Sequence, residues 1–538
     1  MKPIYFIIII FIIFSHKYIS AQDNDRDSWV RTYSTPAEDN NIPLDMTIDR
    51  KSNIYITGRG SGIGTGSIIP TVKYSPEGEK LLELLYETAG SFELGNSIIV
   101  DDDFNIYVSC RASVESARWK LMLLKYSDSG SLIWERTFLP DSIDSASETK
   151  IIQDNAQNII VEGTVWVHGA EQLVLLNYNS KGDLTWHTYF GDDSTSHKFI
   201  DFDIDSNGNI YVAANRKMDL DEPWPETQSV LIKFDKYGKY MWSESFRSNN
   251  AIRIAIDSLS NINMIATHDI ASPDNWSRLL QYNTDGELLW AIDYKDLMYQ
   301  VIYLTDIITD SYDNIIVTGY TSGLDCFDII TIKYDNNGDL IWEEIYSSPD
   351  TLADYSHSMI VDKYDNIYIT GRSVVSSQTS YCIAIKYNPD GMKEWASRFI
   401  DDNKTNNSGR FISVDEISNV FIAGKSGSKY LIIKNIQDIE TSVELIDSEL
   451  PNEYYLSQNY PNPFNPYTTI EFAIPTITHV ELIIYDSIGR EINKLVDKEM
   501  NAGAYKITFD GNKISSGVYY YVLKTSNYME AKTFILLK

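Results

Sequence analysis

Short runs of alternating apolar and polar residues dominate the chain. Residues 314–319 (NIIVTG) and 329–334 (IITIKY) are typical, and both are rich in β-branched side chains. This alternation predicts half-buried β-strands rather than helices. Asp, Asn and Gly separate the runs, where tight hairpins need turn-forming residues. The pattern therefore predicts an all-β fold built from hairpins.

One hairpin signature returns along most of the chain. An Asp followed four residues later by an Asn recurs at intervals of 51 to 53 residues, which identifies an internal repeat. We interpret the pair as a turn whose side chains bond to their own backbone, with calcium ligation as the alternative. The pairs are Asp49/Asn53, Asp101/Asn105, Asp154/Asn158, Asp205/Asn209, Asp257/Asn261, Asp310/Asn314, Asp362/Asn366 and Asp415/Asn419.

A second signature ends most repeats. An aromatic residue is followed four residues later by Gly and eight residues later by a large apolar residue, which is Leu82 in the first repeat. The Gly permits the positive backbone angle of a tight turn, and the apolar residue is expected to wedge between neighbouring sheets. In the other repeats it is tryptophan, at Trp134, Trp186, Trp242, Trp290, Trp342 and Trp395.

The two ends of the repeat region complement each other. Trp29 to Tyr33 resembles the end of a repeat without its beginning, and the last repeat, Phe411 to Ile436, stops after a third strand. If the first segment completes the last repeat, the strands close into a ring. Four-stranded repeats of this length are typical of a β-propeller. We therefore expect an eight-bladed β-propeller over residues 22–440.

One face of this ring is the better candidate for binding. Both repeated hairpins have fixed length and share a face, whereas the other connections vary, and binding sites favour variable loops. Half of the repeats place a cation at the edge of this face. A rim of such cations could hold an anionic polymer or glycan, and the alternative is that they are solvated charges at strand ends. The cations lie six residues after the repeat Asn, at Arg59, Arg111, Arg372 and Lys425.

Composition and the N-terminus narrow the function classes. The 538 residues carry a formal charge of −31, which argues against nucleic acid as a partner. Residues 1–21 have the charged start, apolar core and small final residue of a secretory signal peptide. No later run is long and apolar enough to cross a membrane. Three cysteines, spread one to a repeat, are expected to be buried thiols rather than a disulfide framework or zinc site.

The C-terminal region has a different pattern. We expect an acidic linker at 441–454 and a separate domain at 455–538. Strand-like runs with turns at Gly489, Gly503 and Gly517 predict a small Ig-like β-sandwich there. A proline-rich segment precedes most of these runs, and it reads Pro461, Asn462, Pro463, Phe464, Asn465 and Pro466.

The repeat resembles a known family. The D-x-x-x-N step followed by K-Y-x-x-x-G, as in residues 49–82 and 362–395, is similar to the SBBP-type β-propeller repeats of exported bacterial proteins. That resemblance implies a propeller, one often described as seven-bladed. Seven blades are therefore the alternative to eight.

The C-terminal domain also has a family resemblance. The proline-rich segment, the three glycines named above, the step from Gly517 to Tyr519 and the final strand are similar to the type A sorting domain of the type IX secretion system of Bacteroidetes. The resemblance implies export through the periplasm and contact with the secretion machinery. It also implies a final location at the cell surface or outside the cell.

Catalytic motifs are absent from the sequence. There is no HExxH, no G-x-S-x-G and no P-loop, so we expect no enzyme and no cofactor. The function expected is that of an interaction or carbohydrate-binding protein, with an extracellular glycan or protein as partner. Two alternatives stay open: a polysaccharide hydrolase or lyase, since 76 acidic residues offer many carboxylate pairs, and a structural surface-layer component.

Overall fold

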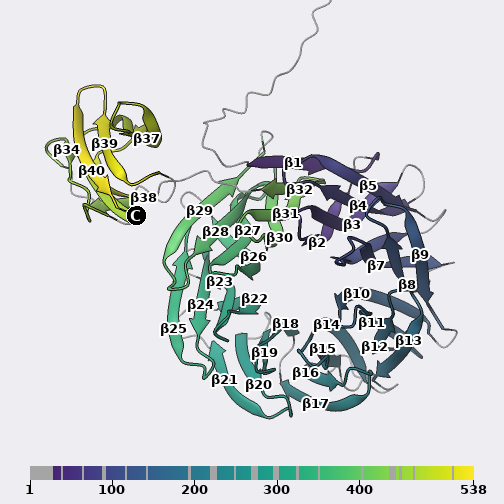
Figure 1. The fold of residues 1–538 in the computed structure, drawn as a ribbon. Helices are drawn as coiled ribbons and strands as arrows, with labels where there is room; N and C mark the ends of the chain where they lie inside the picture. The colour runs from purple at the N-terminus through teal and green to yellow at the C-terminus, as the bar shows by residue number, and fades with distance from the viewer. Residues whose placement is uncertain are drawn as a thin grey trace, which may run out of the picture.

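The repeats form sheets that stand radially around a central axis in the computed structural model (Figure 1). Every regular element among the described residues is a β-strand, so the predicted all-β, propeller-like fold is confirmed. The signal-peptide prediction falls outside the described residues. These are 28–37, 40–62, 66–87, 92–114, 118–140, 143–191, 195–217, 227–247, 250–267, 277–294, 302–322, 326–348, 352–401, 405–434, 444–447, 451–464, 467–511 and 514–537.

Each repeat forms one blade, an antiparallel sheet whose strands follow one another in space as in the sequence, from the ring axis outward. The first blades contain β2 (Ile42–Ile48), β3 (Ile54–Gly62), β4 (Gly66–Tyr74) and β5 (Lys80–Tyr86); β6 (Glu93–Val100), β7 (Ile106–Val114), β8 (Arg118–Tyr126) and β9 (Leu132–Phe138); β10 (Ser145–Gln153), β11 (Ile159–Val167), β12 (Ala170–Tyr178) and β13 (Leu184–Phe190); β14 (Ser196–Ile204), β15 (Ile210–Lys217), β16 (Thr227–Phe234) and β17 (Tyr240–Arg247).

The same order continues around the ring. A single parallel pair, Phe327 with Ala353, joins two of the later blades into one eight-stranded sheet. The strands are β18 (Asn250–Ile256), β19 (Ile262–Thr267), β20 (Ser277–Tyr282) and β21 (Leu288–Tyr294); β22 (Ile302–Thr309), β23 (Ile315–Ser322), β24 (Phe327–Tyr334) and β25 (Leu340–Tyr346); β26 (Ala353–Val361), β27 (Ile367–Ser376), β28 (Thr379–Tyr387) and β29 (Lys393–Phe399).

The N-terminal strand closes the ring. β1 (Trp29–Tyr33) pairs antiparallel with β32 (Lys429–Lys434), and it becomes the outer strand of the sheet that β32 forms with β31 (Val420–Ser426) and β30 (Asn407–Val414). The two ends of the repeat region therefore share one blade. This pairing covers the edge of β32 and gives the last blade four strands, like the other blades.

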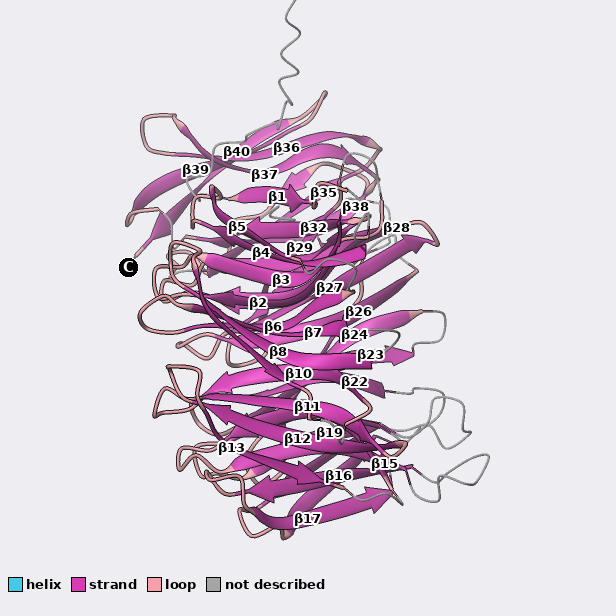
Figure 2. Cartoon of the chain, turned by 90° about the vertical axis from the view of Figure 1, so that its right-hand side faces the viewer, coloured by secondary structure: helices cyan, strands magenta, loops and turns pink. Residues whose placement is uncertain are grey.

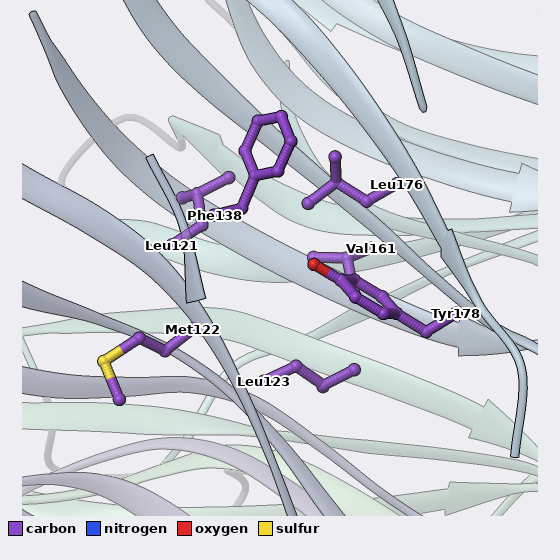
Figure 3. A pocket seen from close by; sticks show the side chains of 7 residues that line it. All are labelled: Leu121, Met122, Leu123, Phe138, Val161, Leu176 and Tyr178. Carbon is purple, nitrogen blue, oxygen red and sulfur yellow. The ribbon is translucent and has the colours of Figure 1, made fainter. Parts of the chain in front are cut away.

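Apolar side chains fill the seams between blades. Figure 3 shows one seam, where Leu121 and Phe138 of one blade face Val161 and Leu176 of the next. The seam leaves no space that a water molecule could occupy. Dense packing of this kind makes core substitutions costly and holds neighbouring blades in a fixed relation.

A large apolar side chain of one blade, a tryptophan in all but one case, lies on a glycine of the next blade at the outer edge of seven seams among the described residues. A Cβ atom on Gly78 would lie 2.6 Å from the ring of Trp29, too close for any side chain there. These glycines also have φ between 77° and 86°, a conformation that suits glycine. Trp395 instead packs near Tyr368, at 6.2 Å between ring centroids. The other pairs are Leu82 on Gly130, Trp134 on Gly182, Trp186 on Gly238, Trp242 on Gly286, Trp290 on Gly338 and Trp342 on Gly391.

The turns between the first and second strands of each blade use the repeat Asp and Asn. In the turn after β22, Asp310 Oδ1 accepts hydrogen bonds from the backbone N–H groups of Tyr312 and Asn314, both at 2.9 Å. Asp310 Oδ2 accepts from the Asn314 side chain, also at 2.9 Å. The Asp and Asn pair therefore stabilises a turn, as we interpreted it from the sequence, where calcium ligation was the alternative.

The C-terminal domain consists of two four-stranded antiparallel sheets around one buried cluster. Three strands were not expected: β34, β37, and β33, which lies inside the predicted linker 441–454 and pairs with β38. The domain therefore begins earlier than residue 455. Its strands are β33 (Glu444–Asp447), β34 (Tyr455–Leu456), β35 (Tyr467–Ile474), β36 (Thr478–Tyr485), β37 (Glu491–Met500), β38 (Gly503–Asp510), β39 (Gly517–Lys524) and β40 (Met529–Leu536).

The proline-rich segment packs along β40. The Phe464 N–H donates to the Ile535 carbonyl at 3.0 Å, and Asn462 Oδ1 accepts from the Ile535 N–H at 2.9 Å. The Phe464 ring is buried, 5.2 Å from the ring of Phe534. Residues 465 and 466 lie outside the described part of the chain.

The other residues that carry the family resemblance of this domain lie in or beside the strands. Gly489 forms the turn between β36 and β37 with φ of 82°. Gly503 and Gly517 begin β38 and β39. Tyr519 stacks on Phe534, with 5.4 Å between ring centroids, and its hydroxyl donates to the Ser515 carbonyl at 2.8 Å. These residues therefore contribute to the core and turns of this domain.

The contact between tryptophan and glycine can be tested at Gly182. Gly182→Ala would place a Cβ 2.9 Å from Trp134 and add left-handed strain. Gly169→Ala is the matched control, because Gly169 has φ of 87° but nothing within 4 Å of its Cβ position. We expect the control to lose about 1–2 kcal/mol of unfolding free energy and Gly182→Ala about 1–3 kcal/mol more. Urea unfolding measures both, and equal losses would contradict the close contact.

Candidate ligand-binding face

The disc has two faces that differ in their connections. The fixed face carries the five-residue turns, such as 49–53 and 75–79, that join first to second and third to fourth strands. The variable face carries the connections between second and third strands and between blades. Figure 2 shows the strands running across the disc from one face to the other.

Contacts between blades occupy the fixed face. Ser52 Oγ donates to Asp415 Oδ2 at 2.8 Å, which links the first and last repeats, and Ser418 Oγ donates to Asp362 at 3.1 Å. Asp365 and Asp313 accept hydrogen bonds from Ser311 and Ser258 in the preceding blades. The side chains of these turns therefore serve the ring, and the variable face is the better candidate for a ligand.

The structure separates the four predicted rim cations into different surroundings. All four lie in the second strand of their blade, near its end at the variable face, and Arg372 is exposed while the others are half-buried. Arg111 lines a pocket with two tryptophans. Arg372 and Lys425 belong to a cluster of basic side chains that also contains Arg410. Arg59 belongs to neither group.

Arg111 lies in an open pocket of about 390 Å³ between the β6–β9 and β10–β13 blades. We call this the tryptophan pocket. The Arg111 guanidinium lies 4.9 Å from the centre of the Trp119 ring, so the cation and the indole stabilise each other. The residues lining the pocket are Arg111, Trp119, Asp144, Ser145, Ala146, Ser147, Trp166 and Gly169.

Backbone contacts hold the walls of this pocket in place. The Arg118 side chain donates to the carbonyl of Ile143 at 2.7 Å, across the seam between the two blades. The Asp144 N–H donates to the Trp166 carbonyl at 2.8 Å. The two tryptophans therefore stand on strands that are tied to each other. Trp119 and Trp166 could not be predicted from the sequence, since neither occupies a repeat position.

The basic cluster comprises His357, Arg372, Arg410 and Lys425, from the β26–β29 blade and the last blade. Burial lowers the pKa of Arg410, and the neighbouring Arg372 lowers it further. Burial and Arg410 likewise lower the pKa of Lys425. His357 Nδ1 donates to the Gly409 carbonyl at 2.7 Å, next to Arg410 in the chain. The cluster therefore spans the seam between two blades.

β-Bulges place two members of this cluster. The strand register shifts between Ser356 and Ser358, and again between Gly409 and Phe411, so His357 and Arg410 are the extra residues. A bulge re-aims the side chain that it carries. Sequence analysis missed both residues because alternation does not reveal where a strand takes an extra residue.

Carboxylates on the inner strands have structural partners. Asp45 Oδ2 accepts from Ser97 Oγ at 2.7 Å and from the Ile98 N–H at 2.9 Å, both in the next blade. Asp306 accepts from the Met359 N–H at 2.8 Å in the same way. Burial raises the pKa of both carboxyl groups. These side chains link successive inner strands.

Other chemistry is sparse in the described part of the chain. No group of three or more His, Cys, Asp or Glu side chains there is placed to hold a metal ion. Cys110 and Cys382 are buried free thiols, and Cys326 is a half-buried one. Among the described residues, no helix is long and apolar enough to cross a membrane.

Comparison with known proteins identifies the C-terminal domain. Residues 458–537 match the family described as Secretion system C-terminal sorting domain. The chain therefore carries a sorting domain of the type IX secretion system. Such a domain directs a protein to the cell surface or the extracellular space, and it implies contact with the secretion machinery. No curated protein matches the chain significantly.

Several solved structures resemble the chain weakly. The Dos1 propeller is 10% identical, with a TM-score of 0.47, covering 76% of this chain and 94% of that one. The propeller domain of the Trilobed protease from Pyrococcus furiosus is 9% identical, with a TM-score of 0.38. The match covers 68% of this chain and 99% of that one. PorZ, a surface component of the type IX secretion system of Porphyromonas gingivalis, is 9% identical, with a TM-score of 0.27. The match covers 95% of this chain and 100% of that one.

The geometry of the basic cluster predicts a change in the titration of His357. Burial, followed by Arg372 and Arg410, holds the pKa of His357 below its usual value. Arg410→Ala removes a positive charge beside the imidazole, so the protonated ring becomes easier to form and the pKa should rise. NMR titration of the histidine ring signals measures it. Arg59→Ala is the control and should leave that pKa unchanged; an unchanged value in Arg410→Ala would refute the cluster.

Proposed function

We propose that the protein is a secreted, eight-bladed β-propeller that binds extracellular carbohydrate through the tryptophan pocket. The tryptophan pocket itself is the observation that carries this proposal. Its two indoles and its charged and hydroxyl groups line one open concavity on the variable face. Ligand sites typically combine apolar and aromatic walls with a few polar groups that fix orientation.

The chemistry of the pocket suits a sugar. A pyranose ring has an apolar face of C–H groups, which can pack on an indole, and a rim of hydroxyls. Arg111 and Asp144 offer a donor and an acceptor for such hydroxyls. The strand that carries Trp119 is bonded across the seam to the Ile143 carbonyl, and the neighbouring Asp144 is bonded to Trp166 within its own blade, so little ordering would accompany binding.

The sorting domain supports an extracellular role. A protein delivered to the cell surface or beyond meets polysaccharide there, and the ring of repeated blades gives a rigid platform for the variable loops. Eight Asp-to-Asn turns, each opening a four-stranded sheet with the N-terminal strand completing the last, support eight blades over seven.

Glycan binding by the full chain tests the pocket. We expect binding to at least one polysaccharide on an array, and Trp119→Ala or Trp166→Ala should weaken it by about tenfold or more, since anchoring aromatic residues dominate interfaces. Tyr237→Ala is the matched control, because Tyr237 is 70% exposed on a fixed-face turn. Binding that survives both tryptophan changes would overturn the proposal. New reducing ends in the same samples would instead favour a hydrolase or lyase.

The role of the sorting domain is tested by its removal. In a bacterium with a type IX secretion system, the chain truncated after residue 440 should accumulate in the periplasm. The full chain should reach the cell surface or the medium. Fractionation with immunoblotting measures both forms. Equal export of the two forms would show that the C-terminal β-sandwich does not direct secretion.

A further inference from the structure

The basic cluster brings like charges together. Among the described residues, no carboxylate lies within ion-pair distance of Arg372, Arg410 or Lys425. This is notable in a chain with 76 acidic and 45 basic residues. Elsewhere in the ring, comparable cations are paired, as Lys150 is with Asp201 and Lys333 with Asp310.

Holding these cations together costs electrostatic free energy, and the packing of the blades offsets it. Like charges close together repel, more strongly where the surroundings are poor in water. Arg410 and Lys425 are both half-buried, and burial is the main cause of their lowered pKa values. An anion placed among the three side chains would relieve the repulsion. The arrangement therefore favours a negatively charged ligand over a neutral one.

An aromatic group continues from the cluster along the same face. It comprises Tyr303, Tyr320, Phe327 and Tyr355, from the β22–β25 and β26–β29 blades. The Arg372 guanidinium lies 4.9 Å from the centre of the Tyr355 ring, which is 4.9 Å from the Tyr320 ring. Tyr303 stacks on Tyr320 at 5.0 Å. Each ring is half-buried, so part of it meets solvent.

We propose that the basic cluster and the aromatic group form a second carbohydrate site, which binds an acidic polysaccharide. The apolar faces of successive sugars pack on the aromatic group, and the cations bind the charged groups of the polysaccharide. Arg372 and Arg410 can each hold a carboxylate or sulfate by paired hydrogen bonds. Other blades separate this site from the tryptophan pocket, and the inference does not rest on that pocket.

The test compares charged and uncharged forms of the same polymer. Calorimetry of the full chain with polygalacturonate, and with its methyl-esterified form, separates charge from backbone shape. A sulfated galactan and its desulfated form make the second pair and distinguish sulfate from carboxylate as the source of charge. We expect at least one charged polymer to bind about tenfold or more tightly than its uncharged form, and to weaken as salt rises.

Variants locate the site. The double change Arg372→Ala with Arg410→Ala should weaken binding of the charged polymer by about tenfold or more, and Arg410→Lys should retain part of it. Arg59→Ala is the matched control, at the same repeat position outside the cluster. Lys425→Ala replaces the double variant if thermal unfolding shows that the latter is misfolded.

Each remaining outcome would overturn the inference. These are no binding of either charged polymer, equal binding of the uncharged forms, or an equal loss in Arg59→Ala. Loss of acidic-polymer binding in Trp119→Ala alone would assign the charged ligand to the tryptophan pocket instead. Loss of array binding in the tryptophan variants with acidic-polymer binding intact would keep both sites, so the two proposals fail separately.

Discussion

The ring depends on one repeated contact. A large side chain in the outer strand of one blade packs on the glycine in a turn of the next blade. At Gly78 the partner is Trp29, from the N-terminal strand, so the same contact also locks the closed ring. Truncating a buried tryptophan typically costs about 3–5 kcal/mol. The glycine meets two demands at once, since it must turn the chain and leave room for the indole. This is why the two residue types recur together at a fixed spacing.

The same construction divides the molecule by function. The turns that carry these glycines, and those that carry the Asp and Asn pairs, lie on the fixed face, and their side chains join blade to blade. Changes to the side chains that make these contacts disturb the ring. The connections on the variable face differ in length and sequence from blade to blade, so each blade can present different side chains there. A pocket with two tryptophans and a cluster of basic side chains can then stand on one ring of nearly identical blades.

The periodic features of this protein could be predicted from sequence, and the local ones could not. The Asp-to-Asn turns, the glycines and the tryptophans recur because the same physical contact recurs, so counting finds them. Arg372 and Lys425 were likewise found at their repeat position, but Arg410 and His357 were not, because β-bulges place them. Trp119 and Trp166 occur once each, in variable segments. Their convergence across a seam depends on how two blades pack. In the sorting domain, β37 was missed because polar residues interrupt its alternation.

Ligands are expected to meet the variable face, while the turns of the fixed face hold blade to blade. Hydrogen–deuterium exchange of the full chain, with and without a polysaccharide that binds, tests this expectation most directly. Protection should increase in the strand ends of the variable face, around residues 111–114, 118–119 and 143–147 or around 372 and 410. It should not change in the Asp-to-Asn turns. Protection confined to those turns, with the variable face unchanged, would show that ligands meet the fixed face instead.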